Sequence, residues 1–189
     1  MEEKKIADAS KKTVVTPFGI KSEEQINKEN LAKELKSQIP KACFVYGSLR
    51  PDDDSGQMWT KQACEGMTAR KAIVKGAQLF KDSYAVAILE RPGHHVVGWV
   101  LTHDDDAVFK EKLEGYDRIE GYNADNPEQG LYMRDVTEAT LVDEDGNETG
   151  ETEFTYIYHR KGISENEPVE DGDWMKRDRS KDGVPCGVQ

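Results

Sequence analysis

A glycine turn that could bind an anion follows a run of β-favouring residues. Residues 44–50 read FVYGSLR, so Gly47 and Ser48 come directly after a short predicted strand. Because glycine has no Cβ, the backbone at Gly47 can turn sharply and come close to a ligand. Successive N–H groups after such a turn can converge on an anionic oxygen. The turn becomes informative only together with a second reactive group, since many glycines at strand ends bind nothing.

Such a group is a carboxylate on the apolar face of a predicted helix over residues 106–120. At about 100° per residue, Glu120 lies within about 40° of Phe109, Leu113 and Tyr116, whereas Glu114 points away. Burial disfavours the charged form of a carboxyl group and raises its pKa. A glutamate in this position can therefore transfer protons near neutral pH. The alternative is a structural glutamate paired with Arg118 or Arg134.

The elements that must position these groups are short strands with period-two patterns of β-branched residues. The sequence predicts them at 43–46, 71–80, 84–89, 96–101, 133–142 and 153–159, the last two forming a hairpin around residues 143–150. Two or three helices accompany them without regular strand–helix alternation. This order is typical of an α+β fold with an antiparallel or mixed sheet.

The domain organisation follows from composition. Residues 1–40 are predicted to be a charged extension with one helix at about 22–39, which Ser22 and Gln25 cap and Pro40 ends. Residues 41–178 form the main domain, and 179–189 a polar tail.

The charge and the cysteine content argue against several classes of partner and of structural site. The formal net charge of −11 argues against nucleic acid or an anionic membrane as a partner. No apolar run is long enough to cross a membrane, and no signal peptide is recognisable. Cys43, Cys64 and Cys186 are an odd and widely spaced set, which indicates neither a disulfide framework nor a zinc site. The acidic segment 143–146 has its glycine too early for a calcium loop and predicts a hairpin turn. We therefore expect a cytoplasmic protein without a metal.

Taken together, these segments make the chain resemble the gamma-glutamylcyclotransferase-like family, also called AIG2-like. Its members begin with F-x-Y-G-T/S-L, carry a central D-x-x-E-G and a Tyr-x-Arg strand, and often end with Gly-Asp-Trp. The corresponding residues here are 44–49, 117–121, 132–134 and 172–174. The resemblance covers about residues 42–177 and implies a small mixed or antiparallel β-barrel flanked by helices.

The sequence departs from the family pattern in two places. The first 40 residues have no counterpart in the short members, and Tyr84-Ala85 stands where an aromatic residue followed by proline is expected. A competing alignment would place Asp117, rather than Glu120, at the catalytic carboxylate. The match of Glu120-Gly121 to the family pattern and the helical face of Glu120 both favour Glu120.

The resemblance implies a cofactor-independent enzyme of the acyltransferase or lyase type. Its substrate's own α-amine attacks the γ-carbonyl, which gives 5-oxoproline and releases an amine or amino acid. Glu120 is the implied general acid and base. The implied substrate-binding residues, which act through their backbone amides, are Tyr46, Gly47, Ser48 and Leu49. Tyr132 and Arg134 either line the pocket or pack the barrel.

Two questions stay open at this point. The same fold could serve as a non-catalytic module that binds a small molecule or a protein. The leaving group could be an amino acid, an amine or the lysine of an isopeptide, and the oligomeric state is not predicted.

Overall fold

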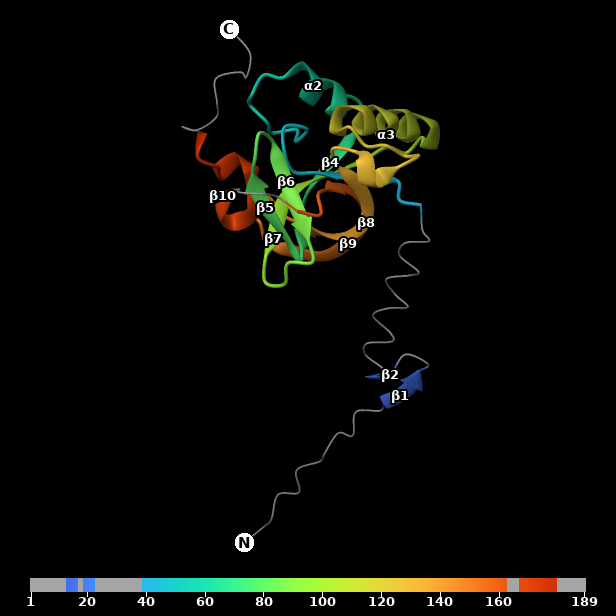
Figure 1. Cartoon of the computed structure of the whole chain (residues 1–189). Coiled ribbons are helices and arrows are strands. Elements are labelled where there is room, and N and C mark those ends of the chain that lie inside the picture. Colours follow the sequence, from blue (N-terminus) through green and yellow to red (C-terminus); the bar gives the residue numbers. More distant parts are fainter. Residues whose placement is uncertain (1–12, 17–18, 23–38, 163–166, 180–189) are drawn as a thin grey trace. The chain divides into compact units, whose positions relative to one another are not determined.

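The computed structural model describes residues 13–16, 19–22, 39–162 and 167–179 (Figure 1). The chain divides into two compact units, Met1–Ile39 and Pro40–Gln189. In the first unit, β1 (Thr13–Thr16) pairs antiparallel with β2 (Gly19–Ser22), a strand pair that the sequence analysis did not predict. The helix expected at about 22–39 lies outside the described residues, apart from its two end positions.

The second unit is built on a closed five-stranded barrel, which confirms the expected α+β fold. Its strands are β3 (Ala42–Val45), β4 (Thr68–Lys75), β7 (His95–Thr102), β8 (Met133–Val142) and β9 (Glu148–His159), in the order β3-β7-β4-β8-β9. The β3–β9 pair is parallel and the others are antiparallel, so the barrel is mixed. Closure leaves no unpaired sheet edge in the barrel.

A three-stranded sheet lies beside the barrel, with β5 (Ala77–Lys81) between β6 (Ala85–Leu89) and β10 (Glu167–Pro168) (Figure 1). The prediction of one continuous strand over 71–80 was wrong. Gly76 interrupts it with a φ of +74°, a backbone conformation that glycine adopts without steric cost. The chain leaves the barrel at this point and pairs with β6 instead.

The hairpin of β8 and β9 was predicted, although β9 begins earlier than expected. Its turn is closed by the Asp143 side chain, whose Oδ1 accepts hydrogen bonds from the backbone N–H groups of Asp145 and Asn147 at 3.0 and 2.8 Å. The acidic segment is therefore a hairpin turn, as the sequence analysis expected.

Helix α3 (Asp106–Glu120) has the bounds that the sequence predicted. Asp105 caps its first turn by accepting from the N–H groups of Ala107 and Val108. Gly121 ends it in the left-handed conformation that is common after a helix. Tyr116 on its buried face donates to the carbonyl of Ala63, 2.8 Å away, in the short helix α2 (Met58–Cys64). No helix in the described part of the chain is long and apolar enough to cross a membrane.

The core has two parts, and β3 contributes to both. Phe44 and Tyr46 pack in one cluster with residues of β4, β5 and β7, whereas Cys43 and Val45 pack in the other with α3. Alternate strand residues point to opposite faces, so one short strand joins the barrel interior to the helical layer. Three 3₁₀ turns complete the unit: η1 (Pro127–Gln129), η2 (Glu170–Gly172) and η3 (Trp174–Lys176).

Candidate active site

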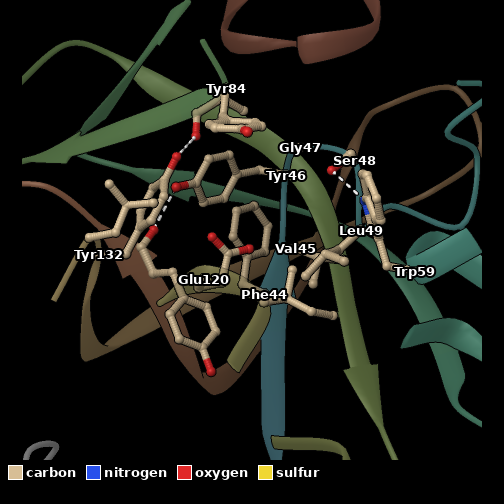
Figure 2. A pocket seen from close by; sticks show the side chains of 14 residues that line it. Phe44, Val45, Tyr46, Gly47, Ser48, Leu49, Trp59, Tyr84, Glu120 and Tyr132 are labelled. Carbon is tan, nitrogen blue, oxygen red and sulfur yellow. Dashed lines mark hydrogen bonds between the residues drawn. The ribbon is translucent and has the colours of Figure 1, made fainter. Parts of the chain in front are cut away.

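A cavity of about 330 Å³ opens where β3 ends, beside the C-terminus of α3 (Figure 2). Its walls come from segments that are far apart in the sequence. The lining residues are Phe44, Val45, Tyr46, Gly47, Ser48, Leu49, Trp59, Tyr84, Ala85, Ile119, Glu120, Leu131, Tyr132 and Tyr158. All five residues that the sequence analysis assigned to a site therefore line one cavity.

The segment Gly47–Arg50 forms a tight turn, in which the Arg50 N–H donates to the carbonyl of Gly47 at 3.1 Å. Within the described residues, the N–H groups of Gly47, Ser48 and Leu49 donate to no protein acceptor. Helix α2 supports the turn from outside, because Thr60 Oγ1 donates to the Ser48 carbonyl. The turn thus offers unused backbone donors at the cavity wall, which is the property of an anion-binding site.

Gly47 is required here for close packing and not for an unusual backbone conformation. Its φ is not in the left-handed region. A Cβ at this position would lie 2.9 Å from the Cβ of Ala85 in β6, well inside the usual contact distance between carbon atoms. The sharp turn that the sequence predicts is present, but glycine is needed at its first position for a steric reason, because β6 passes directly against the loop.

Arg50 anchors the end of this turn and is itself almost fully buried. Its guanidinium group donates to both carboxylate oxygens of Asp52, at 2.8 and 2.7 Å, and to Asp173 at 2.6 Å. The indole of Trp99 donates to Asp52 at 3.1 Å. Charged hydrogen bonds of this kind hold a planar guanidinium in one orientation. The turn is thereby tied to η3 near the end of the described chain.

Glu120 is the last residue of α3, and its carboxylate points into the cavity (Figure 2). No hydrogen bond or ion pair holds this carboxylate within the described part of the chain. Burial raises the pKa of Glu120 to about 7, and the positive charge of Arg160 partly opposes this shift. Near neutral pH, this carboxyl group therefore exists in both protonation states.

Asp117 has a different environment, although it lies one helical turn before Glu120. Both of its oxygens accept from Nη1 of Arg134, at 2.8 and 2.7 Å, and Oδ1 also accepts from the Tyr158 hydroxyl at 2.7 Å. Neither Asp117 nor Arg134 lines the cavity. Near the C-terminus of this helix, Asp117 is thus the paired structural carboxylate, and it joins α3 to β8 and β9.

Two tyrosine hydroxyls hold the cavity walls together. Tyr46 donates to the carbonyl of Tyr158 at 2.6 Å and accepts from the N–H of Ala87 at 3.2 Å, which links β3 to β9 and β6. Tyr132 donates to the carbonyl of Ala85 at 2.8 Å. Since these hydroxyls are engaged with the backbone, their first role is to fix the shape of the cavity.

The sequence analysis missed the residues at the cavity mouth. Four exposed apolar side chains lie there, from α2, the β5–β6 turn, α3 and the loop before β8: Trp59, Tyr84, Ile119 and Leu131. Only the departure at Tyr84-Ala85 from the family pattern gave a signal. In the described segments, no group of three or more His, Cys, Asp or Glu side chains is arranged to hold a metal ion.

The solved structures that resemble this chain share less than a fifth of its residues. No curated protein matches this chain. Among solved structures, PH0828 of Pyrococcus horikoshii, an uncharacterized protein, is 17% identical over 70% of this chain and 88% of its own, with a TM-score of 0.44. An AIG2-like protein of Mus musculus is 16% identical over 67% and 81%, with a TM-score of 0.48. YkqA of Bacillus subtilis is 17% identical over 72% and 40%, with a TM-score of 0.45.

The sequence itself matches a family model. The model is described as "Gamma-glutamyl cyclotransferase, AIG2-like", and the match runs over residues 43–176, which includes the loop after β3, helix α3 and η3. This range is more than half of the 189 residues. The chain therefore belongs to the AIG2-like gamma-glutamyl cyclotransferase family.

Proposed function

We propose that this protein is a gamma-glutamyl cyclotransferase, which converts a γ-glutamyl compound into 5-oxoproline and a free amine. The observation that carries the proposal is the environment of Glu120. Its carboxyl group has no ion-pair or hydrogen-bond partner in the described chain, has a pKa of about 7, and faces a loop with unused N–H donors across one cavity. An unpaired carboxylate in such a place is costly for folding, which favours a catalytic role.

Binding folds the substrate over itself. The N–H groups of Gly47, Ser48 and Leu49, which have no acceptor among the described residues, supply donors for the substrate carboxylate and for the oxyanion that develops on the γ-carbonyl oxygen. The attacking amine and the carbonyl belong to one molecule, so the reaction needs no protein nucleophile. Well-aligned intramolecular attack can reach effective molarities of about 10⁵ M or more.

Glu120 carries the proton between two nitrogen atoms. As a carboxylate it accepts a proton from the α-ammonium, and the neutral amine then forms a bond to the γ-carbon. The tetrahedral intermediate collapses as the bond between the γ-carbon and the leaving nitrogen breaks. Protonated Glu120 gives this first proton to the leaving nitrogen as the bond breaks, and its restored carboxylate takes the second proton from the ring nitrogen. That proton passes to the released amine, so the products are the neutral lactam and an ammonium ion. A pKa of about 7 suits both transfers near neutral pH.

The test is to incubate the purified protein with a panel of γ-glutamyl amino acids, amines and the Glu–Lys isopeptide, and to quantify 5-oxoproline by mass spectrometry. We expect the wild type to form product and Glu120→Gln to lose about 10²-fold or more in turnover. Glu114→Gln is the matched control, because Glu114 lies on the exposed side of the same helix.

Full activity of Glu120→Gln would refute the assignment of the general acid and base. If the panel compounds bound to the wild type without being cyclised, the protein would be a non-catalytic binding module on this fold.

A further inference from the structure

The mouth of the active-site cavity is unusually apolar for an exposed surface. In the described part of the chain, six large apolar side chains are exposed, and four of them line this cavity: Trp59, Tyr84, Ile119 and Leu131, with exposed fractions of 39, 61, 45 and 52%. We call these four residues the apolar rim. An exposed apolar cluster of this kind marks a binding surface, whereas single exposed apolar residues need no explanation.

The apolar rim is continuous with the proposed catalytic centre. Ile119 directly precedes Glu120 at the end of α3, and Trp59 donates through its indole N–H to the Ser48 hydroxyl, 3.3 Å away, on the turn with the free amides. During cyclisation, the leaving nitrogen must be within reach of Glu120. Whatever is attached to that nitrogen then extends from the catalytic centre toward the cavity mouth, where the rim lies.

The charge of the cavity restricts what can be attached there. Among the described residues that line the cavity, Glu120 is the one carboxylate, and none of them is an arginine, lysine or histidine. Arg160, the one cation whose charge acts on the Glu120 pKa, donates to Asp82 through Nη1 at 3.0 Å and lies over the ring of Tyr132, while its buried Nε has no hydrogen-bond partner in the described chain. A carboxylate on the leaving group would gain no cationic partner from the described lining residues, whereas a neutral apolar group would remove part of the exposed apolar surface from water.

We propose that the apolar rim is a subsite for the leaving group and that it selects a neutral apolar amine of aromatic size over an amino acid. This inference rests on the proposed function. It names the substrate class of the same site: γ-glutamyl amides in which the released amine carries an aryl or branched alkyl group and no carboxylate.

Three substrates with the same γ-glutamyl half test the inference. γ-Glutamyl-phenethylamide differs from γ-glutamyl-ethylamide by a phenyl group, and γ-glutamyl-phenylalanine differs from γ-glutamyl-phenethylamide by one carboxylate. We expect kcat/KM for the phenethylamide to exceed that of each of the other two by about 10-fold or more, the usual discrimination of an apolar pocket. The readout is 5-oxoproline formation.

Substitution of one residue of the apolar rim tests whether the rim causes the preference for the phenethylamide. Tyr84 is suited to this test because its side chain is exposed and makes no hydrogen bond within the described structure. Tyr84→Ala should lower the ratio of kcat/KM between phenethylamide and ethylamide by about 5-fold or more. Met58→Ala is the matched control, because Met58 is equally exposed but does not line the cavity, and its ratio should not change.

The outcomes separate this inference from the proposed function. Turnover of all three substrates at similar kcat/KM, or a preference for the phenylalanine compound, would overturn the subsite and leave the cyclotransferase standing. If no compound is cyclised, calorimetric titration with the same three compounds decides: tighter binding of the phenethylamide supports the subsite without catalysis, and equal affinities overturn it. If the wild type sediments as a dimer and Tyr84→Ala sediments as a monomer, the apolar rim would instead be a surface for self-association, which would overturn the subsite.

Discussion

At the scale of single residues, Asp117 and Glu120 near the end of α3 are two acids with different surroundings. Asp117 accepts from a guanidinium group and a tyrosine hydroxyl, so its charge is compensated. Glu120, three residues later, has no such partner in the described chain, and its pKa rises to about 7. Two carboxylates on one helical turn therefore differ in their partners, and the one without a partner in the described chain is the one that lines the cavity.

The raised pKa of Glu120 makes the stability of the protein depend on pH. In the unfolded chain a glutamate has a pKa near its reference value of 4.5, and in the folded protein this value is about 7. Between these pH values the folded state binds more protons than the unfolded state. The contribution of Glu120 to the free energy of unfolding is therefore fully present below pH 4.5 and is lost as pH rises through 7.

We predict that Glu120→Gln removes this pH dependence. Relative to the wild type, the variant should gain up to about 3 kcal/mol in free energy of unfolding between pH 4.5 and pH 8, because its amide does not ionise. Urea unfolding of both proteins at several pH values measures the difference. If Glu120 is the catalytic base, wild-type kcat/KM should also rise with pH through about 7. A constant stability difference would show that Glu120 titrates normally.

At the scale of elements, the turn Gly47–Arg50 can pack closely against β6 because residue 47 has no side chain. A Cβ on residue 47 would meet the Cβ of Ala85 at 2.9 Å. Strand β6 is held by its ladder with β5, by the Ala87 N–H, which donates to the Tyr46 hydroxyl, and by the Ala85 carbonyl, which accepts from Tyr132, so it cannot move aside freely. The conformation of the loop at Gly47 therefore depends on β6, a strand from a different part of the sequence.

We predict that Gly47→Ala destabilises the protein by about 1–3 kcal/mol and raises KM, because overpacking displaces the loop. The double variant Gly47→Ala/Ala85→Gly removes the opposing methyl group and should recover most of both losses. Chemical unfolding and steady-state kinetics of the two single variants and the double variant give the coupling energy. Simple additivity of the two substitutions would rule out this contact as the cause.

At the scale of the whole molecule, the C-terminal segment 167–179 packs against the barrel domain and reaches the turn Gly47–Arg50 at the candidate site. Its β10 extends the sheet of β5, Trp174 is buried in the core, and Asp173 pairs with Arg50 at the end of the substrate loop. The Gly-Asp-Trp motif thereby acquires a physical role: it anchors the loop from a distant part of the sequence. Arg50 and Asp173 are positioning residues, since neither lines the cavity.

We predict that Asp173→Asn lowers the free energy of unfolding by about 1–3 kcal/mol and raises KM several-fold with a smaller effect on kcat, because Arg50 loses one of its two charged partners. The control is Asp171→Asn, which removes an exposed ion pair with Lys176 and should change stability by less than about 1 kcal/mol. An unchanged KM in Asp173→Asn would show that the loop holds its position without this pair.

The sequence by itself determined the features that depend on local interactions. Helix α3, its caps and the orientation of Glu120 follow from helical periodicity and from residues within one turn, so they could be predicted without a structure. The same holds for β3, the glycine turn after it and the hairpin turn at Asp143. The motif order also indicated the family and, through it, the barrel.

Tertiary structure alone decided which distant segments meet. Neither the break at Gly76 nor the contact of Gly47 with Ala85 can be read from the sequence, because both depend on where β5 and β6 lie beside the barrel. The register of β8 and β9 decides which acid of α3 pairs with Arg134, and this pairing leaves Glu120 without a partner among the described residues. The apolar rim is assembled from four separate elements, so no local pattern marks it: burial and pairing are properties of the folded chain, whereas periodicity is a property of the sequence.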